Sequence, residues 1–207
     1  MLNAAPVLGV LAGLACIADT IPYVRDIVRG TTRPHRGTWL IWGVLAIVVF
    51  ASQRAEGASW SLIMAGSQAV VTSVVFLLAI RHGEGGMSAP DVALIAMAGG
   101  GVIGWLVADE PLIAIAGVIT ADVIAAAMMA PKTFRDPDSE TLATFAFASL
   151  GGALAAGAVG TADLSLLAYP VYYCLCNAAL ASLIYSRRAV LRGAPVRGRV
   201  RVSRPAA

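Results

Sequence analysis

The stretch SWSLIMAGSQAVVTSVVFLLAI, residues 59–80, contains no charged side chain. A helix needs about 20 predominantly apolar residues to cross roughly 30 Å of hydrocarbon. The stretch meets that length and predicts a transmembrane helix. Similar runs recur along the chain, and the seven predicted spans are residues 5–24, 38–53, 59–80, 90–108, 111–131, 141–159 and 164–185.

The composition of the whole chain favours the same class. Of the 207 residues, 58% are hydrophobic and 13% are charged, whereas a soluble domain carries about 25% charged residues. Too little polar surface remains to cover a globule in water, so lipid is the expected solvent. We therefore predict an all-α integral membrane protein that is embedded in a lipid bilayer.

Basic residues are distributed unevenly between the predicted loops. With seven spans, the first, third and fifth loops and the C-terminal tail share one side, and they hold all fifteen basic residues except Arg54. Cytoplasmic loops carry an excess of Lys and Arg, which predicts an outside N-terminus and a cytoplasmic C-terminus. The preference for arginine over lysine and the alanine content indicate a high-GC bacterium, and hence its cytoplasmic (inner) membrane.

The first three spans and the last three resemble each other. The leading span of each set ends beside a proline, Pro22 or Pro131, with an Arg-Asp pair a few residues later. Two three-span sets have the same orientation only if one further span separates them, as in parallel transporter repeats. We predict repeats at residues 1–81 and 110–187, a linker helix at 82–109 and a disordered basic cytoplasmic tail at 188–207.

The two prolines have two interpretations. A proline inside a helix removes one backbone hydrogen bond and clashes with the carbonyl four residues earlier, and the resulting kink makes Pro22 and Pro131 candidate hinges. Alternatively, each proline ends its helix beside a loop. The basic tail likewise either holds the C-terminus in the cytoplasm or binds anionic lipid.

The 3+1+3 span plan, the outside N-terminus and the paired prolines resemble the PQ-loop and SWEET superfamily of transporters over roughly residues 5–188. In that family glutamine typically follows the proline, whereas this chain has Tyr23 and Lys132. The resemblance implies that a small polar solute, of the sugar or amino acid class, crosses through a central cavity between the repeats. Pro22 and Pro131 would be the hinges of alternating access.

The resemblance also implies site residues. SWEET members bind sugars through asparagines on the third helix of each repeat, and Gln68 lies in that region of the third span. Proton-coupled members of the amino acid class have an acidic residue nine positions before the second motif. Asp122 stands nine residues before Pro131, which implies proton coupling through Asp122.

Two aspartates lie inside predicted spans. A charged side chain near the bilayer centre costs about 2.5–3.5 kcal/mol, so Asp122 should face the bundle interior. It is either a proton carrier or a structural aspartate that ties helices together. Asp19 lies on the same helical face as Tyr23 and is a second candidate for proton coupling, unless it pairs with an arginine of the first loop.

The seventh span presents a polar stripe. Tyr169, Tyr173 and Asn177 recur at four-residue spacing, and such a stripe in lipid should face the bundle. Asn177 and Tyr173, together with Gln68 and Trp42, are candidate substrate-binding residues. We expect Trp39 and Trp60 to be interfacial, and packing remains the alternative for Trp42.

The sequence lacks the motifs that are typical of several classes of function. The sequence has no nucleophile elbow, no phosphate-binding glycine loop and no metal-ligand spacing, so we expect no enzyme activity, no cofactor and no metal. The basic residues line a membrane face, which argues against nucleic-acid binding. The three cysteines all fall inside apolar runs, which favours neither a disulfide framework nor a zinc site.

The alternative to a transporter is a non-transporting membrane sensor or assembly partner whose basic tail binds lipid or protein. A transporter predicts that Asp122, Gln68 and Asn177 line one cavity, whereas the alternative predicts that they are scattered in a packed interior. The sequence leaves open the solute, the coupling ion, the direction of transport and the oligomeric state, a homo-oligomer included.

Overall fold

The computed structural model describes residues 4–55, 60–86, 88–107 and 111–193. These ranges contain seven α-helices, one short 3₁₀ helix and no β-strand, so the prediction of an all-α protein is confirmed. The elements are α1 (Ala5–Val28), α2 (Arg36–Ala55), α3 (Ser61–His82), α4 (Ala89–Val107), α5 (Pro111–Arg135), η1 (Pro137–Ser139), α6 (Leu142–Val159) and α7 (Leu164–Gly193).

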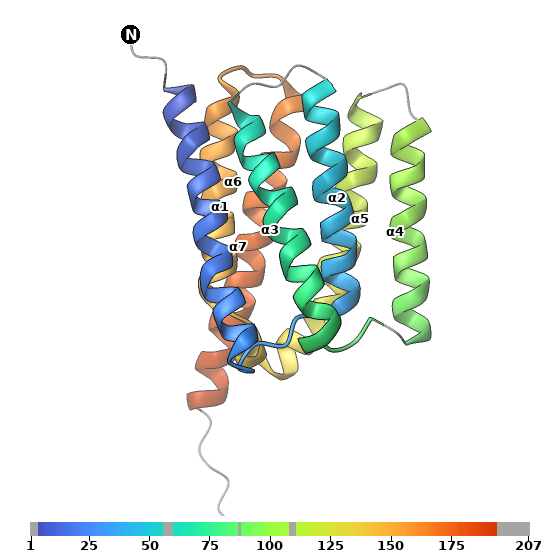
Figure 1. The fold of residues 1–207 in the computed structure, drawn as a ribbon, viewed down its shortest axis with the longest axis vertical. Helices are drawn as coiled ribbons and strands as arrows, with labels where there is room; N and C mark the ends of the chain where they lie inside the picture. Colours follow the sequence, from blue (N-terminus) through green and yellow to red (C-terminus); the bar gives the residue numbers. More distant parts are fainter. Residues whose placement is uncertain (1–3, 56–59, 87, 108–110, 194–207) are drawn as a thin grey trace, which may run out of the picture.

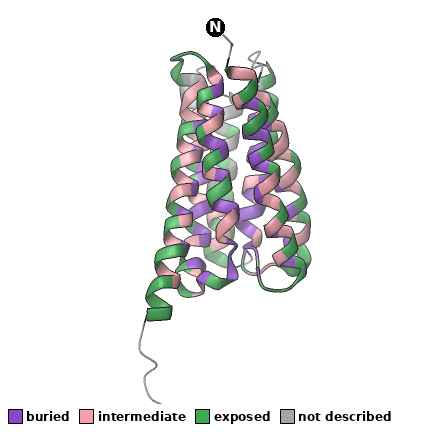
Figure 2. Ribbon diagram, turned by 90° about the vertical axis from the view of Figure 1, so that its left-hand side faces the viewer, coloured by how far each residue is buried: buried purple, intermediate pink, exposed green. Residues whose placement is uncertain are grey.

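Five helices, α1, α3, α5, α6 and α7, are long and apolar enough to cross a membrane, while the apolar part of α2, Arg36–Ala51, is shorter. Large hydrophobic side chains are exposed on the outer faces; Leu77 and Leu175, for example, are 63% and 65% exposed. Figure 2 shows that buried residues gather on the inner faces of the helices. An apolar perimeter of this extent suits lipid better than water.

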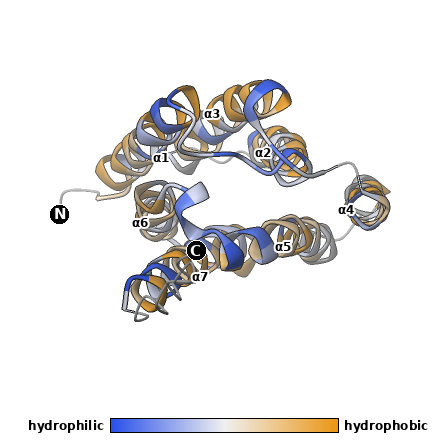
Figure 3. Ribbon diagram, turned by 90° about the horizontal axis from the view of Figure 1, so that it is seen from below, coloured by the Kyte–Doolittle hydropathy of each residue, from blue (hydrophilic) through white to orange (hydrophobic). Residues whose placement is uncertain are grey.

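The helices form two layers of three, with α4 at one edge (Figure 3). In the first layer α3 packs against both α1 and α2, and in the second α7 packs against both α5 and α6. In neither layer do the two outer helices contact each other through described residues. Between the layers, α1 packs against α6 and α2 packs against α5, while α4 packs on α5 and α2.

Three connections, α1–α2, α3–α4 and α5–α6, lie at the same end of the bundle as the end of α7 (Figure 1). We call this the loop end. The start of α1 lies at the opposite end. An isolated β-bridge between His35 and Glu84 joins the first and second of these connections, through hydrogen bonds from Arg36 N to Glu84 O and from Glu84 N to Pro34 O.

Pro22 and Pro131 lie inside α1 and α5, which continue to Val28 and Arg135. The interpretation that each proline ends its helix is therefore wrong. The hydrophobicity of the sequence falls at these prolines, but the backbone remains helical because a proline removes only one hydrogen bond and neighbouring groups support the rest. Their role as hinges stays a prediction.

The last helix is longer than the apolar pattern indicates. The predicted tail began at residue 188, yet α7 remains helical to Gly193. Arg188 explains the extension, because its guanidinium donates hydrogen bonds to the carbonyl oxygens of Pro137 and Glu140 and so attaches α7 to the α5–α6 connection. The rest of the predicted tail, residues 194–207, lies outside the described residues.

Small residues bring the helices close together within each layer. A Cβ atom added to Gly152 of α6 would lie 2.7 Å from the backbone nitrogen of Cys174 in α7. One added to Gly13 of α1 would lie 2.8 Å from Cγ2 of Ile63 in α3. Such contacts supply the packing that drives helix association in lipid.

Candidate functional site

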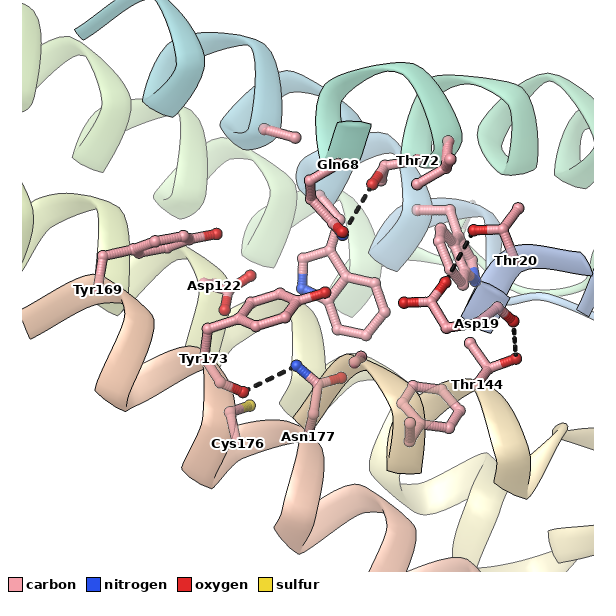
Figure 4. Close-up of a pocket in the computed structure, with 16 residues that line it drawn as sticks. Asp19, Thr20, Gln68, Thr72, Asp122, Thr144, Tyr169, Tyr173, Cys176 and Asn177 are labelled. Carbon is pink, nitrogen blue, oxygen red and sulfur yellow. Dashed lines mark hydrogen bonds between the residues drawn. The ribbon is translucent and has the colours of Figure 1, made fainter. Parts of the chain in front are cut away.

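A cavity lies between the two layers and is lined by side chains from every long helix except α4. Figure 4 shows its polar side chains pointing inward from both layers. Its volume is about 30 Å³, which corresponds to about one water molecule. The cavity is therefore small, and its wall combines polar and aromatic side chains.

The two layers contribute matching groups to this cavity. The first helix of each layer supplies a carboxylate, Asp19 from α1 and Asp122 from α5. The third helix of each layer supplies an amide, Gln68 from α3 and Asn177 from α7. Each of these four residues was predicted as a site residue from its own position in the sequence. The fold brings all four to the same cavity.

Asp19 is buried and hydrogen-bonded within its own helix. Its Oδ1 accepts a hydrogen bond from the hydroxyl of Thr20 at 2.8 Å. The backbone carbonyl of Asp19 accepts a second one, at 2.8 Å, from Thr144 of the opposite layer. The alternative that Asp19 pairs with an arginine of the first connection is not supported, because no ion pair joins it to a described basic residue.

Both polar atoms of the Gln68 amide form hydrogen bonds within the protein. Oε1 accepts a hydrogen bond from Cys16 Sγ at 2.8 Å, and Nε2 donates to the hydroxyl of Thr72 at 3.0 Å. These contacts fix the amide plane. One N–H and one lone pair remain for a solute, since a primary amide has two donors and two acceptor positions.

Asn177 is the more available amide. Its Nδ2 donates to the carbonyl of Tyr173, one turn earlier in α7, at 2.9 Å. Its Oδ1 accepts no hydrogen bond from a described residue and lies at the cavity (Figure 4). An acceptor that faces a cavity in this way can take a donor from water or from a bound solute.

Asp122 lies beside two buried donors that have no hydrogen-bond partner. Trp42 Nε1 and Tyr172 OH are close enough to act on this carboxylate electrostatically. Neither forms a hydrogen bond of acceptable geometry with any described residue. Unpaired buried donors are costly, so this side of the cavity is poised for a small rearrangement or for an occupant.

Aromatic side chains form much of the remaining wall. Trp39 and Trp42 of α2 meet edge to face with ring centroids 5.2 Å apart, and Tyr169 and Tyr173 of α7 lie 6.0 Å apart. Phe145 of α6 completes the set. Trp39 was expected at the membrane interface, but it is buried because its ring packs on Tyr23, with centroids 4.9 Å apart.

A buried carboxylate closes the bundle at the loop end. Glu140 is fully buried between the layers and accepts a hydrogen bond from the hydroxyl of Tyr23 at 2.7 Å. It also forms an ion pair with Lys132. Tyr23 directly follows Pro22, and Lys132 directly follows Pro131, so the residues after both prolines meet on one carboxylate. We call Tyr23, Lys132 and Glu140 the latch.

Two opposing electrostatic effects act on the carboxyl group of Glu140 in the latch. Burial raises the pKa of Glu140, while the charge of Lys132 and its hydrogen bonds act to lower it. Lys132 also donates to the carbonyl oxygen of Arg33, whose guanidinium pairs with Asp136 across the layers. The loop end is thus held by several polar contacts between connections that are distant in sequence.

The structure brings together all six predicted polar or aromatic site residues, which are Asp19, Asp122, Gln68, Asn177, Tyr173 and Trp42. Sequence reasoning missed Glu140. Its one signal was a carboxylate placed directly before a predicted span, on the side where basic residues accumulate. Hydrophobic patterning does not show that such a loop residue folds inward.

Comparison of this chain with protein-family models, with curated proteins and with solved structures finds no match. No group of three or more potential metal ligands of the His, Cys, Asp or Glu type occurs among the described residues.

Proposed function

We propose that this chain is a membrane transporter that moves a small polar solute by alternating access between its two three-helix layers. We interpret the layers as parallel repeats and the seven helices as seven spans. The matching order of helices in each layer supports this interpretation, because the third helix lies between the first and second in both.

The observation that carries the proposal is the convergence of Asp122, Gln68 and Asn177 on one cavity. Intramembrane polar side chains are costly and usually mark a solute or ion pathway. The alternative of a packed interior predicts that these residues are scattered. A cavity between two repeats is also where transporters of this kind bind their solutes.

The small volume of the cavity supports assigning the structure to a closed state of the proposed cycle. A volume of about 30 Å³ is far below the 300–1,000 Å³ or so of a typical small-molecule site. The layers must therefore separate before a sugar or amino acid enters. Separation at the loop end requires the latch to break, which makes Pro22 and Pro131 suitable hinges because each directly precedes a latch residue.

We also propose an orientation of the chain in the membrane and a coupling of solute transport to protons. The described basic residues other than Arg54 lie in the part of the chain nearest the loop end, which we place in the cytoplasm of a bacterium, with the N-terminus outside. Asp122 and Asp19 are the proposed proton-coupling residues. Gln68, Asn177, Tyr173 and Trp42 are the proposed solute-binding residues.

Solute and proton flux in proteoliposomes tests the proposal. The wild type is compared with Asp122→Asn across a panel of sugars, amino acids and amines. Asp138→Asn is the matched control, because this loop carboxylate is 67% exposed and lies outside the cavity. We expect flux in the wild type and the control and its loss in Asp122→Asn.

The small volume of the cavity favours one second candidate, a non-transporting sensor or assembly partner with a basic tail. In that case the polar residues would stabilise a permanently closed bundle. Correctly folded protein that moves no member of the panel, with or without a proton gradient, would support this candidate.

A further inference from the structure

The charge of the cavity wall is one-sided. Asp19 and Asp122 line it from opposite layers, and no Lys, Arg or His is among the described residues that line it. Both aspartates are more than nine-tenths buried. A buried carboxylate without a basic partner is unfavourable unless it is protonated or meets a cation, so the wall is complementary to positive charge.

The aromatic side chains favour the same class of occupant. Trp39, Trp42, Phe145, Tyr169 and Tyr173 line the cavity from both layers. Aromatic faces attract cations, tryptophan most strongly, and cages of aromatic rings recognise ammonium groups. A sugar or an anion gains less from this wall, because neither brings a positive charge to the carboxylates or to the rings.

Unpaired polar atoms supply a third observation. Asn177 is more than nine-tenths buried, and its Oδ1 has no hydrogen-bond partner among described residues. Asp122 lies beside two buried donors, Trp42 Nε1 and Tyr172 OH, that have no hydrogen bond of ordinary geometry in the described part of the chain. Asn177 Oδ1 and the Asp122 carboxylate are both acceptors on the cavity, and both suit the N–H groups of an ammonium ion.

We propose that the solute is a small organic ammonium cation, bound by Asp122, Asn177 and the aromatic wall. The inference rests on the proposed transport function and narrows its solute class. The inference also specifies how movement of the cation is coupled to movement of a proton. When the cation enters, the Asp122 carboxyl releases its proton to the water on that side, and it takes up a proton when the cation leaves on the other side. One positive charge is therefore exchanged for one proton.

Binding is tested first on the native chain, in detergent or nanodiscs, from the shift in its unfolding temperature. The probes are two matched pairs. Methylammonium, whose cation carries N–H donors, is compared with methanol, and choline, whose trimethylammonium group carries charge but no N–H donor, is compared with its tert-butyl isostere. We expect a saturable rise with at least one cation and none with its neutral partner. Equal effects within both pairs would overturn the inference.

Variants then locate the site. Asp122→Asn should weaken the apparent affinity for the cation by roughly tenfold or more, since it removes the charge that pairs with the ammonium group. Asp138→Asn should leave it unchanged. Since the comparison of each cation with its isostere needs no variant, poor folding of Asp122→Asn leaves that result standing.

Transport separates this inference from the proposed function. Proteoliposomes with an acidic lumen should take up the labelled cation faster than those without a pH gradient, and Asp122→Asn should abolish the difference. Flux of a sugar or neutral amino acid without cation binding would overturn the ammonium assignment and leave the transporter standing. Absence of both binding and flux for every probe would overturn both.

Discussion

The hydroxyl of Tyr23 donates a 2.7 Å hydrogen bond to the carboxylate of Glu140, and the two residues are 117 positions apart in the chain. Tyr23 lies in α1 of the first layer, while Glu140 lies in the connection before α6 of the second. Lys132 completes the latch from α5. Opening the bundle at the loop end therefore requires a specific, fully buried contact to break.

Tyr23→Phe should destabilise the protein. The change removes the hydroxyl that donates to Glu140 and that accepts a hydrogen bond from Trp39 Nε1 at 3.1 Å, but it preserves the ring. A hydrogen bond to a charged group is worth about 1.5–3 kcal/mol, and we expect a loss of unfolding free energy in this range. Reversible denaturation in detergent measures it.

The matched control is Tyr185→Phe, because Tyr185 is 68% exposed on α7. We expect no more than a small change there. A double-mutant cycle with Glu140→Ala, which removes the acceptor, isolates the pair. Additive effects of Tyr23→Phe and Glu140→Ala would show that the two side chains do not act on each other.

His35 should make stability depend on pH. It caps α2 through Nδ1, which accepts a hydrogen bond from the backbone nitrogen of Thr38 at 3.3 Å. Burial lowers its pKa, and the nearby carboxylate of Asp91 opposes that shift only in part. A histidine whose pKa is lowered by folding binds fewer protons in the native state, so stability is lost as the pH falls below about 6.5.

The unfolding temperature of the wild type should therefore fall more steeply than that of His35→Gln between about pH 7.5 and 5.5. His82, the second of the two histidines in the chain, is exposed. His82→Gln should follow the wild type. If His35→Gln shows the same pH slope as the wild type, the buried neutral histidine is not the cause.

Gly152→Ala should weaken the contact between α6 and α7. A Cβ atom there would lie 2.7 Å from the backbone nitrogen of Cys174, and overpacking of this kind costs about 1–3 kcal/mol. Gly100→Ala in α4 is the control, because nothing lies within 4 Å of the added atom. Equal unfolding free energies for the two variants would contradict the close packing.

Much of the fold follows from hydrophobic patterning, since a run of about 20 apolar residues has few alternatives in lipid. The positions of the helix ends do not follow from this patterning. α1 and α5 pass their prolines, because backbone hydrogen bonding continues after the apolar pattern stops. Asp19 and Asp122 were recognisable because a charge inside a span is costly enough to require a reason.

The partners of the site residues were not predictable in the same way. The Cys16–Gln68 contact and the place of Glu140 between the layers depend on how the helices are rotated and on how a polar connection folds back. His35 and Asp91 are likewise brought together by packing of the α1–α2 connection against the first turn of α4, with 3.8 Å between Nε2 and Oδ1. The spacing of residues along the sequence does not predict such pairs.

Accessibility of Cys176 from the two sides of the membrane tests alternating access most directly. Cys176 lines the cavity, and it becomes the only thiol when Cys16 and Cys174 are replaced by serine. A membrane-impermeant thiol reagent is added from either side, in the background of Tyr23→Phe or Tyr185→Phe. We predict that Tyr23→Phe raises the rate of modification from the loop end and lowers it from the opposite end, because one population grows at the expense of the other. Rates that stay equal to those of Tyr185→Phe, or that rise together from both ends, would contradict the account.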